Sequence, residues 1–419
     1  MQKLLVYADF DWLKEPTLVG ELSYESLRGT DSYGFCFNEE WLRIQGGLFL
    51  SADLNNYSGV QYTTGGDDIF GCFSDALPDR WGRTLLNRRE QILAQGEKRP
   101  LRRLTSFDYL LGIDDYSRMG GFRFKESVDA DFINSSPILR IPPLTDIRAL
   151  EAASKEVEQS EERNELPDRR WIVQLIQPGT SLGGARPKAS VLDTDGSLCI
   201  AKFPSLKDDY DAELWEHLCH FLAKRAGITV AETRVLQTSE TYHTLISKRF
   251  DRTEQGKRIH FASTMTLLGL HDGDNAMNGY GYLDIVDFII RHCTDVESNL
   301  RELYRRVVFN ICIGNSDDHF RNHGFLLTPK GWTLSPAYDI NPTLSKHQSL
   351  LVTSTSNEAD LSLLRDASEE YMLSKEIADT IILEVCNALK DWLSLATRLG
   401  ITKREIALFA DRWEFSASH

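Results

Sequence analysis

The stretch GNSDDHFRNHGFLL, residues 314–327, says most about the fold of this chain of 419 residues. It follows a helical pattern over residues 300–313, where apolar side chains recur every three or four positions. Gly314 can adopt the left-handed backbone that ends a helix. The polar residues after it are therefore predicted to form a loop held by a rigid helix, and such loops commonly carry catalytic groups.

Asp317 and Asn322 stand five residues apart in this loop, which is the spacing of the catalytic Asp and the metal-binding Asn in protein kinases. Phosphoryl transfer from ATP needs a carboxylate that accepts the proton of the attacking hydroxyl, and it needs oxygen ligands for Mg²⁺. A hairpin with its turn at residues 328–331 is predicted next, and it leads to Asp339, where a kinase keeps its second metal-binding aspartate. We expect Asp317 to be the catalytic base and Asn322 and Asp339 to bind Mg²⁺.

Two other interpretations of this loop remain open. Asp and Asn are common in turns at helix ends for conformational reasons alone. Carboxylates and imidazoles also suit a transition-metal ion, which here would be bound by Asp317, Asp318, His319 and His323. Asp339 favours the kinase interpretation, in which His319 braces the loop through hydrogen bonds.

Lys202 is the candidate for binding the α- and β-phosphates of ATP. It ends an apolar strand face in a predicted hairpin whose turn is residues 193–196. Its expected carboxylate partner is Glu213 or Glu216 on a helix predicted over residues 209–226. The alternative is an ordinary surface lysine at the end of a strand.

A small-residue loop, GTSLGGARPKA at residues 179–189, precedes this hairpin. Gly183 and Gly184 permit close approach of the backbone to phosphate, and Lys188 adds positive charge beside it.

A strand predicted over residues 242–247 leads into a candidate hinge. Its backbone could hydrogen-bond adenine, unless the apolar run is simply core, and its residues are Lys248, Arg249 and Phe250.

The order of the predicted elements indicates an α+β fold with a protein-kinase-like core of two lobes. Residues 1–143 are predicted to form an N-terminal, mainly β subdomain with one helix over residues 81–94. Residues 144–252 would form the β-rich small lobe with the glycine-rich loop and Lys202. Residues 253–419 would form the mainly helical catalytic lobe.

The composition, with 42% hydrophobic and 26% charged residues, is that of an ordinary globular protein. The seven cysteines are scattered without a CxxC pair, which argues against disulfides or a zinc site. The chain shows no secretory signal pattern and no apolar run of about 20 residues, so we expect a cytoplasmic protein without a membrane partner.

A net charge of -15 argues against direct binding of nucleic acid. The exception is the basic stretch at residues 80–103, which would form a solvated helix face or meet a phosphate or acidic partner.

Several of these segments resemble the HipA-like serine/threonine kinases, the toxins of bacterial toxin-antitoxin pairs. The resemblance rests on SLGGARPKA (181–189), IAKFP (200–204), KRFDR (248–252), the loop at 315–327 and SPAYDIN (335–341), with weaker similarity at FSDALPDR (73–80) and RMGGFRF (118–124). The chain has neither HRD nor DFG, and its glycine-rich loop is not GxGxxG.

The resemblance implies an ATP- and Mg²⁺-dependent kinase that phosphorylates a serine of a protein substrate, which in founding members looks like an aminoacyl-tRNA synthetase. Asp317 would be the base, Asn322 and Asp339 the Mg²⁺ ligands, and Lys202 the ATP lysine. Ser181 matches the loop serine, in the cofactor-binding region, whose autophosphorylation switches such kinases off. The usual partner is a helix-turn-helix antitoxin, through which the protein would reach DNA only indirectly.

Two alternatives remain. A small-molecule phosphotransferase would use the same Asp, Asn and Asp chemistry on a metabolite. A catalytically silent co-repressor would bind the helix-turn-helix antitoxin without binding nucleotide.

Overall fold

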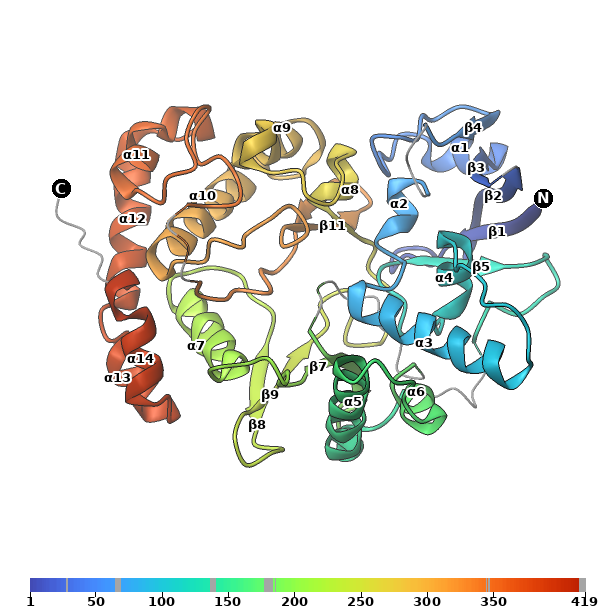
Figure 1. Cartoon of the computed structure of the whole chain (residues 1–419). Helices are drawn as coiled ribbons and strands as arrows, with labels where there is room; N and C mark the ends of the chain where they lie inside the picture. The colour runs from blue at the N-terminus through green and yellow to red at the C-terminus, as the bar shows by residue number, and fades with distance from the viewer. Residues whose placement is uncertain are drawn as a thin grey trace. The chain divides into compact units, whose positions relative to one another are not determined.

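The computed structural model describes residues 1–27, 29–64, 69–135, 141–176, 184, 186–343, 345 and 347–413 (Figure 1). The chain divides into two compact units. Unit 1 comprises Met1–Lys207 and Lys248–Ala262, and unit 2 comprises Asp208–Ser247 and Ser263–His419. Antiparallel sheets and helices together make an α+β fold, as predicted. The domain boundaries proposed at residues 143 and 252 stay predictions.

Unit 1 is built around a five-stranded sheet with the strand order β4-β3-β2-β1-β5. On β1, alternate side chains are buried, at Leu4, Val6 and Ala8, because side chains along a strand point to opposite faces in turn. An aromatic core that includes Phe35, Phe73 and Phe122 completes this mainly β region. The strands are β1 (Gln2–Ala8), β2 (Thr17–Leu27), β3 (Thr30–Phe37), β4 (Val60–Tyr62) and β5 (Phe122–Lys125).

The helix predicted over residues 81–94 is α3 (Arg80–Gly96), and Asp79 caps its N-terminus by accepting a hydrogen bond from the Gly82 N–H. The predicted hairpin is also confirmed, with β6 (Lys188–Leu192) and β7 (Leu198–Lys202) antiparallel. The other helices of unit 1 are α1 (Glu39–Gln45), α2 (Gly71–Ser74), α4 (Ser106–Gly112), α5 (Ile147–Glu162), α6 (Arg169–Ile176) and the 3₁₀ turn η1 (Leu144–Asp146).

The basic stretch at residues 80–103 forms several ion pairs within unit 1. Arg83 also lies over the ring of Tyr109, with its guanidinium carbon 5.0 Å from the ring centre. These contacts favour a structural use of the stretch over a binding patch. The ion pairs are Arg88 with Glu161, Arg99 with Glu90 and Glu97, and Arg102 with Asp108.

Unit 2 is mainly helical, and α10 (Val296–Ile313) is its central support. Leu303, Val307 and Val308 are fully buried, and α10 packs against α12 (Lys375–Leu389) and α9 (Tyr282–His292) (Figure 1). The remaining helices and turns are α7 (Ala212–Arg225), α8 (Thr264–Leu268), α11 (Leu361–Asp366), α13 (Trp392–Leu399), α14 (Lys403–Phe409), η2 (Ala276–Asn278), η3 (Ser368–Tyr371) and η4 (Ala410–Arg412).

The predicted hairpin after the polar loop is present as β11 (Gly324–Thr328) and β12 (Gly331–Leu334). A second antiparallel pair in unit 2 consists of β8 (Thr233–Leu236) and β9 (Thr244–Lys248). The short strand β10 is Phe261–Ser263. Within the described residues, no helix combines the length and apolar character that crossing a membrane requires.

Candidate active site

The polar loop of unit 2 begins where α10 ends. Gly314 adopts the left-handed conformation with φ 69°, as the sequence predicted for this helix end. The loop is then fixed from a distant segment, since the N–H and hydroxyl of Ser349 both donate to the carbonyl of Ser316, at 3.0 and 2.8 Å. Thr343 donates its N–H to the Gly314 carbonyl, at 2.9 Å. The start of the loop is therefore held between the end of α10 and the segment that contains Thr343 and Ser349.

Asp317 and Asn322 lie close together, as their spacing predicted. The Asn322 side-chain amide donates to the Asp317 carbonyl at 3.0 Å, and the Asn322 N–H donates to the His319 carbonyl at 2.8 Å. Asn322 is buried, and its carboxamide oxygen accepts no hydrogen bond from any described residue. That oxygen is available as a ligand for a hard cation.

The segment after β12 returns to this loop. The Tyr338 hydroxyl donates to the carbonyl of Arg321 at 2.6 Å, while Ala337 exchanges backbone hydrogen bonds with Thr229 and Ala231. Asp339, the next residue, has φ 56°, in the left-handed region that residues other than glycine rarely adopt. Such conformations cluster at functional sites, and here the conformation sets the direction of the Asp339 side chain.

The electrostatics connect Asp317 with Asp339. Partial removal of the Asp317 carboxylate from water raises its pKa, His319 lowers it, and the negative charges of Asp339 and Asp318 raise it further. Two carboxylates that repel each other, together with the Asn322 oxygen, form an oxygen donor set of the kind that Mg²⁺ prefers. The chemistry of Asp317, Asn322 and Asp339 therefore suits Mg²⁺, the ion that the sequence predicted.

The transition-metal alternative finds no support in unit 2. Among the residues that the structure describes, no three His, Cys, Asp or Glu side chains gather where a metal ion could be bound. Asp318 and His323 contact each other instead, with His323 Nε2 2.8 Å from Asp318 Oδ2. Burial acts to raise the pKa of Asp318, but His323 and the hydrogen bonds from His323 and Tyr282 lower it below its usual value.

The side chain that supports the loop by hydrogen bonding is His323, through its contact with Asp318, and not His319 as expected. Within the described residues the buried Nδ1 of His319 has no hydrogen-bond partner, and His319 contributes through its backbone, whose N–H donates to the Asp317 carbonyl at 3.0 Å. The sequence did not predict that Asp318 and His323 form a pair, although Asp318 follows Asp317 and His323 follows Asn322.

Lys202 lies half-buried at the end of β7, opposite Lys188 in the hairpin register. The turn of this hairpin is at the predicted place, because the Asp193 N–H donates to the Ser197 carbonyl. Glu213 and Glu216 are both buried on α7 in unit 2. Which of them pairs with Lys202 stays a prediction.

Lys188 is buried within unit 1. Its ammonium lies 3.1 Å from Asp79 Oδ2, and its carbonyl accepts a hydrogen bond from the Trp81 indole at 3.1 Å. Gly184 has φ 92°, and a Cβ there would lie 3.0 Å from the Lys188 ammonium. The role of Lys188 and Gly184 beside phosphate stays a prediction. Ser181 and Gly183 lie outside the described residues.

The candidate hinge residue Arg249 is buried. Its N–H donates to the Leu198 carbonyl at 3.0 Å, and its guanidinium donates to Asp251 and to the Ser117 carbonyl. The side chain and N–H of Arg249 thus serve the fold. Any hydrogen bond from this segment to adenine would come from the remaining backbone groups of Lys248, Arg249 or Phe250, and this stays a prediction.

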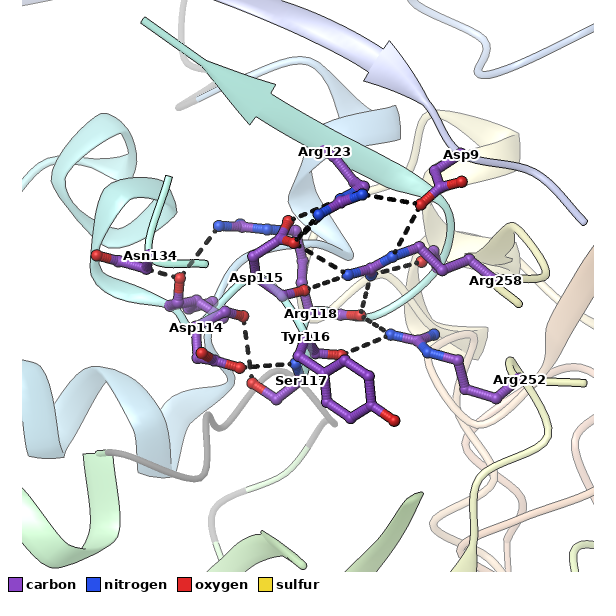
Figure 2. A network of polar contacts seen from close by, with 12 residues as sticks. Asp9, Asp114, Asp115, Tyr116, Ser117, Arg118, Arg123, Asn134, Arg252 and Arg258 are labelled. Atoms are coloured by element: carbon purple, nitrogen blue, oxygen red, sulfur yellow. Dashed lines mark hydrogen bonds and ion pairs between the residues drawn. The ribbon is translucent and has the colours of Figure 1, made fainter. Parts of the chain in front are cut away.

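Arg249 belongs to a cluster of arginines and aspartates in unit 1, and Figure 2 shows part of this cluster, including Arg252 and Arg258. Asp251 accepts hydrogen bonds from Arg249, Arg252 and the Gly120 N–H, and although burial acts to raise its pKa, the arginines hold that pKa well below the usual value. Burial lowers the pKa of Arg252 to about 9. The sequence did not predict this cluster, although Arg118 and Arg123 fall in the segment RMGGFRF, and Arg249, Asp251 and Arg252 fall in KRFDR. The other members include Asp9, Asp114, Asp115, Arg118, Arg123 and Arg258.

Comparison with known proteins bears on both units. The model of the HipA-like C-terminal domain family matches residues 180–393, just over half of the chain. The "Serine/threonine-protein kinase toxin HipA" of Shewanella oneidensis is 22% identical over 353 residues, which cover 77% of this chain and 72% of that protein. A "Putative kinase" of Haemophilus influenzae is 25% identical over 202 residues, 42% of this chain and 57% of that protein, so the match spans little more than half of this relative.

Among solved structures, a chain of the Shewanella oneidensis HipA, HipB and operator DNA complex superposes with a TM-score of 0.65. The superposition covers 98% of this chain and 95% of that chain at 15% sequence identity. At this identity the likeness establishes the fold, and it confirms the predicted fold class.

Proposed function

The chain belongs to the HipA-like family, and from this we propose that it is an ATP- and Mg²⁺-dependent serine/threonine protein kinase. One observation carries the proposal. Within unit 2, Asp317 and Asn322 come from one loop and Asp339 from beyond the following hairpin, yet a hydrogen bond joins the first two and the charge of Asp339 acts on Asp317. Family membership alone would not supply this arrangement, because a fold does not determine an activity.

Each of these residues has a distinct task in the proposed reaction. Asp317 orients the serine hydroxyl of the protein substrate and accepts its proton, while the hydroxyl oxygen bonds to the γ-phosphorus and the bond from that phosphorus to the β-γ bridging oxygen breaks, which releases ADP. Asn322 and Asp339 hold Mg²⁺, which neutralises charge on the phosphates when it is bound. Lys202 binds the α- and β-phosphates, and the segment around Gly184 and Lys188 lies along the nucleotide.

We further propose that the protein is a growth-arresting toxin. The similarity to HipA of Shewanella oneidensis supports this, since that protein is named a kinase toxin and was solved in a complex with HipB and operator DNA. On this proposal the chain binds a helix-turn-helix antitoxin and reaches DNA through it. Its substrate is a cellular protein of the aminoacyl-tRNA synthetase class, and phosphorylation of Ser181 switches the kinase off.

Incubation of the full chain with Mg²⁺ and labelled ATP tests the kinase. We expect label on the protein itself, located at Ser181 by mass spectrometry, and none in Asp317→Ala. Asp287→Asn is the matched control and should label normally, because among the described residues the Asp287 side chain is paired only with Arg291, in an exposed ion pair on α9.

The other outcomes separate the alternatives. Unchanged labelling of Asp317→Ala would exclude Asp317 as the base. Consumption of ATP in a metabolite extract without labelled protein would indicate a small-molecule phosphotransferase. Tight binding to a helix-turn-helix partner, with no nucleotide binding in calorimetry, would identify a silent co-repressor.

A further inference from the structure

A buried carboxylate lies directly beside the proposed base. Asp318 is 4% exposed, and one of its oxygens, Oδ2, is within hydrogen-bonding distance of three side chains. The Tyr282 hydroxyl donates to it at 2.7 Å, the Asn310 amide donates to it at 2.7 Å, and His323 Nε2 lies 2.8 Å from it. Such a charge is costly to bury, and here it is matched by three donors.

These donors come from the rigid elements of unit 2. Tyr282 is the first residue of α9, and Asn310 lies in the last turn of α10. His323 directly precedes β11, and its carbonyl accepts hydrogen bonds from both the N–H and the hydroxyl of Thr264, at 2.8 and 3.0 Å. Asp318 therefore connects two helices and a strand at one point.

Asp318 and His323 are each adjacent in sequence to a residue of the proposed active site. Asp318 follows the proposed base Asp317, and His323 follows the proposed metal ligand Asn322. Two contacts therefore run across the loop side by side. One is the hydrogen bond from Asn322 to the Asp317 carbonyl, and the other joins the next residues along the chain, Asp318 and His323. Two links across the same loop fix the distance between base and ligand, which is what preorganisation requires.

We infer that Asp318 and His323 are positioning residues that hold Asn322 in place as a metal ligand and Asp317 in place as the base. This inference rests on the proposed function. It assigns neither residue to the metal or to the substrate. Groups that orient metal ligands typically affect metal affinity or activity by about 10 to 100-fold when they are removed.

Binding of Mn²⁺ in the presence of a non-hydrolysable ATP analogue, measured by electron paramagnetic resonance, tests the inference without catalysis. Asp318→Asn replaces an acceptor oxygen by an amide donor, and His323→Phe removes the donor but keeps a ring. We expect the half-saturating Mn²⁺ concentration to rise at least about tenfold in both variants. His323→Gln keeps an amide donor near the place of Nε2 and should rescue binding to within about threefold of the wild type.

Two further variants complete the design. Asp287→Asn changes an exposed residue of α9, the helix that begins with Tyr282, and this variant should bind Mn²⁺ as the wild type does. If Asp318→Asn does not fold, Tyr282→Phe removes one donor and keeps the buried charge, and a smaller rise in the same direction is expected.

The results separate this inference from the proposed function. Wild-type Mn²⁺ affinity in both Asp318→Asn and His323→Phe, with a lowered melting temperature, would overturn the inference and assign the pair a structural role alone. Failure of the wild-type protein to bind the nucleotide and Mn²⁺ at all would overturn the proposed function and the inference with it.

Discussion

The side-chain amide of Asn322 donates a hydrogen bond of 3.0 Å to the backbone carbonyl of Asp317. This hydrogen bond turns the carboxamide oxygen of Asn322 away from the carbonyl, so that the oxygen can serve as a ligand in the proposed Mg²⁺ site. The side chain at residue 322 must therefore supply both an N–H donor for the Asp317 carbonyl and an oxygen for the proposed metal ion, and a carboxamide supplies both.

We therefore expect the Asn322→Asp variant to lose kinase activity, although aspartate still offers oxygen ligands to a metal ion. A carboxylate would repel the Asp317 carbonyl and add negative charge beside Asp317 and Asp339. We expect autophosphorylation to fall at least about tenfold and the Mg²⁺ requirement to change. Titration of activity against Mg²⁺ measures both. The same replacement at the exposed Asn387 on α12 is the control, and equal activity in the two variants would contradict the role of Asn322.

Asp339 should tolerate replacement by glycine better than by alanine in a stability measurement. The left-handed conformation at φ 56° costs an alanine about 1 kcal/mol and a glycine almost nothing. We expect Asp339→Ala to unfold at lower denaturant than Asp339→Gly, while both lose kinase activity because the carboxylate is gone. If the two variants were equally stable, the backbone at residue 339 would not be strained.

Asp251→Asn should destabilise unit 1. Asp251 is completely buried and compensates Arg249 and Arg252, so its neutralisation leaves buried positive charge. Removing one partner of such a cluster costs about 3 to 5 kcal/mol in the free energy of unfolding. Chemical denaturation measures it. Glu40→Gln, which breaks only the exposed pair with Arg43, should change the free energy by less than about 1 kcal/mol.

Stability should fall on acidification below about pH 6.5, partly because of His260. Burial lowers the pKa of His260 to about 3, so the unfolded chain takes up a proton there that the folded chain does not. The unfolded state then binds more protons between the two pKa values, and stability rises with pH across that window, by up to about 1.4 kcal/mol per pH unit.

Denaturation of the wild type and of His260→Gln between pH 4.5 and about 6.5 tests this, since most carboxylates stay ionised in that range. The variant should show a shallower pH dependence. Identical slopes would mean that His260 does not stay neutral in the folded protein.

Local sequence signals predicted the supports of the candidate site. The end of α10 at Gly314 and the hairpin of β11 and β12 follow from helix periodicity and turn residues, which act over a few positions. The spacing of Asp317 and Asn322 likewise predicted their proximity, because one short loop contains both.

The tertiary structure decided which partners the side chains of Arg249, Lys188 and Asp318 have. The hydrogen bond from Arg249 to the Ser117 carbonyl joins residues 132 positions apart, and Lys188 is held by Asp79 from the N-terminal part of the chain. No local pattern shows which of two adjacent aspartates, 317 or 318, will be buried. Only packing against α9 and α10 does so, since it supplies the donors that make a buried carboxylate stable.

The sequence by itself thus determined the order of the elements, the loop after α10 and the chemical groups available in it, because these depend on neighbours along the chain. The tertiary structure decided which polar groups remain available for a substrate or a metal ion and which are held by distant partners. Hydrogen bonds and ion pairs between distant residues form only once the chain is folded, and they select Asp317 for the surface and Asp318 for the interior.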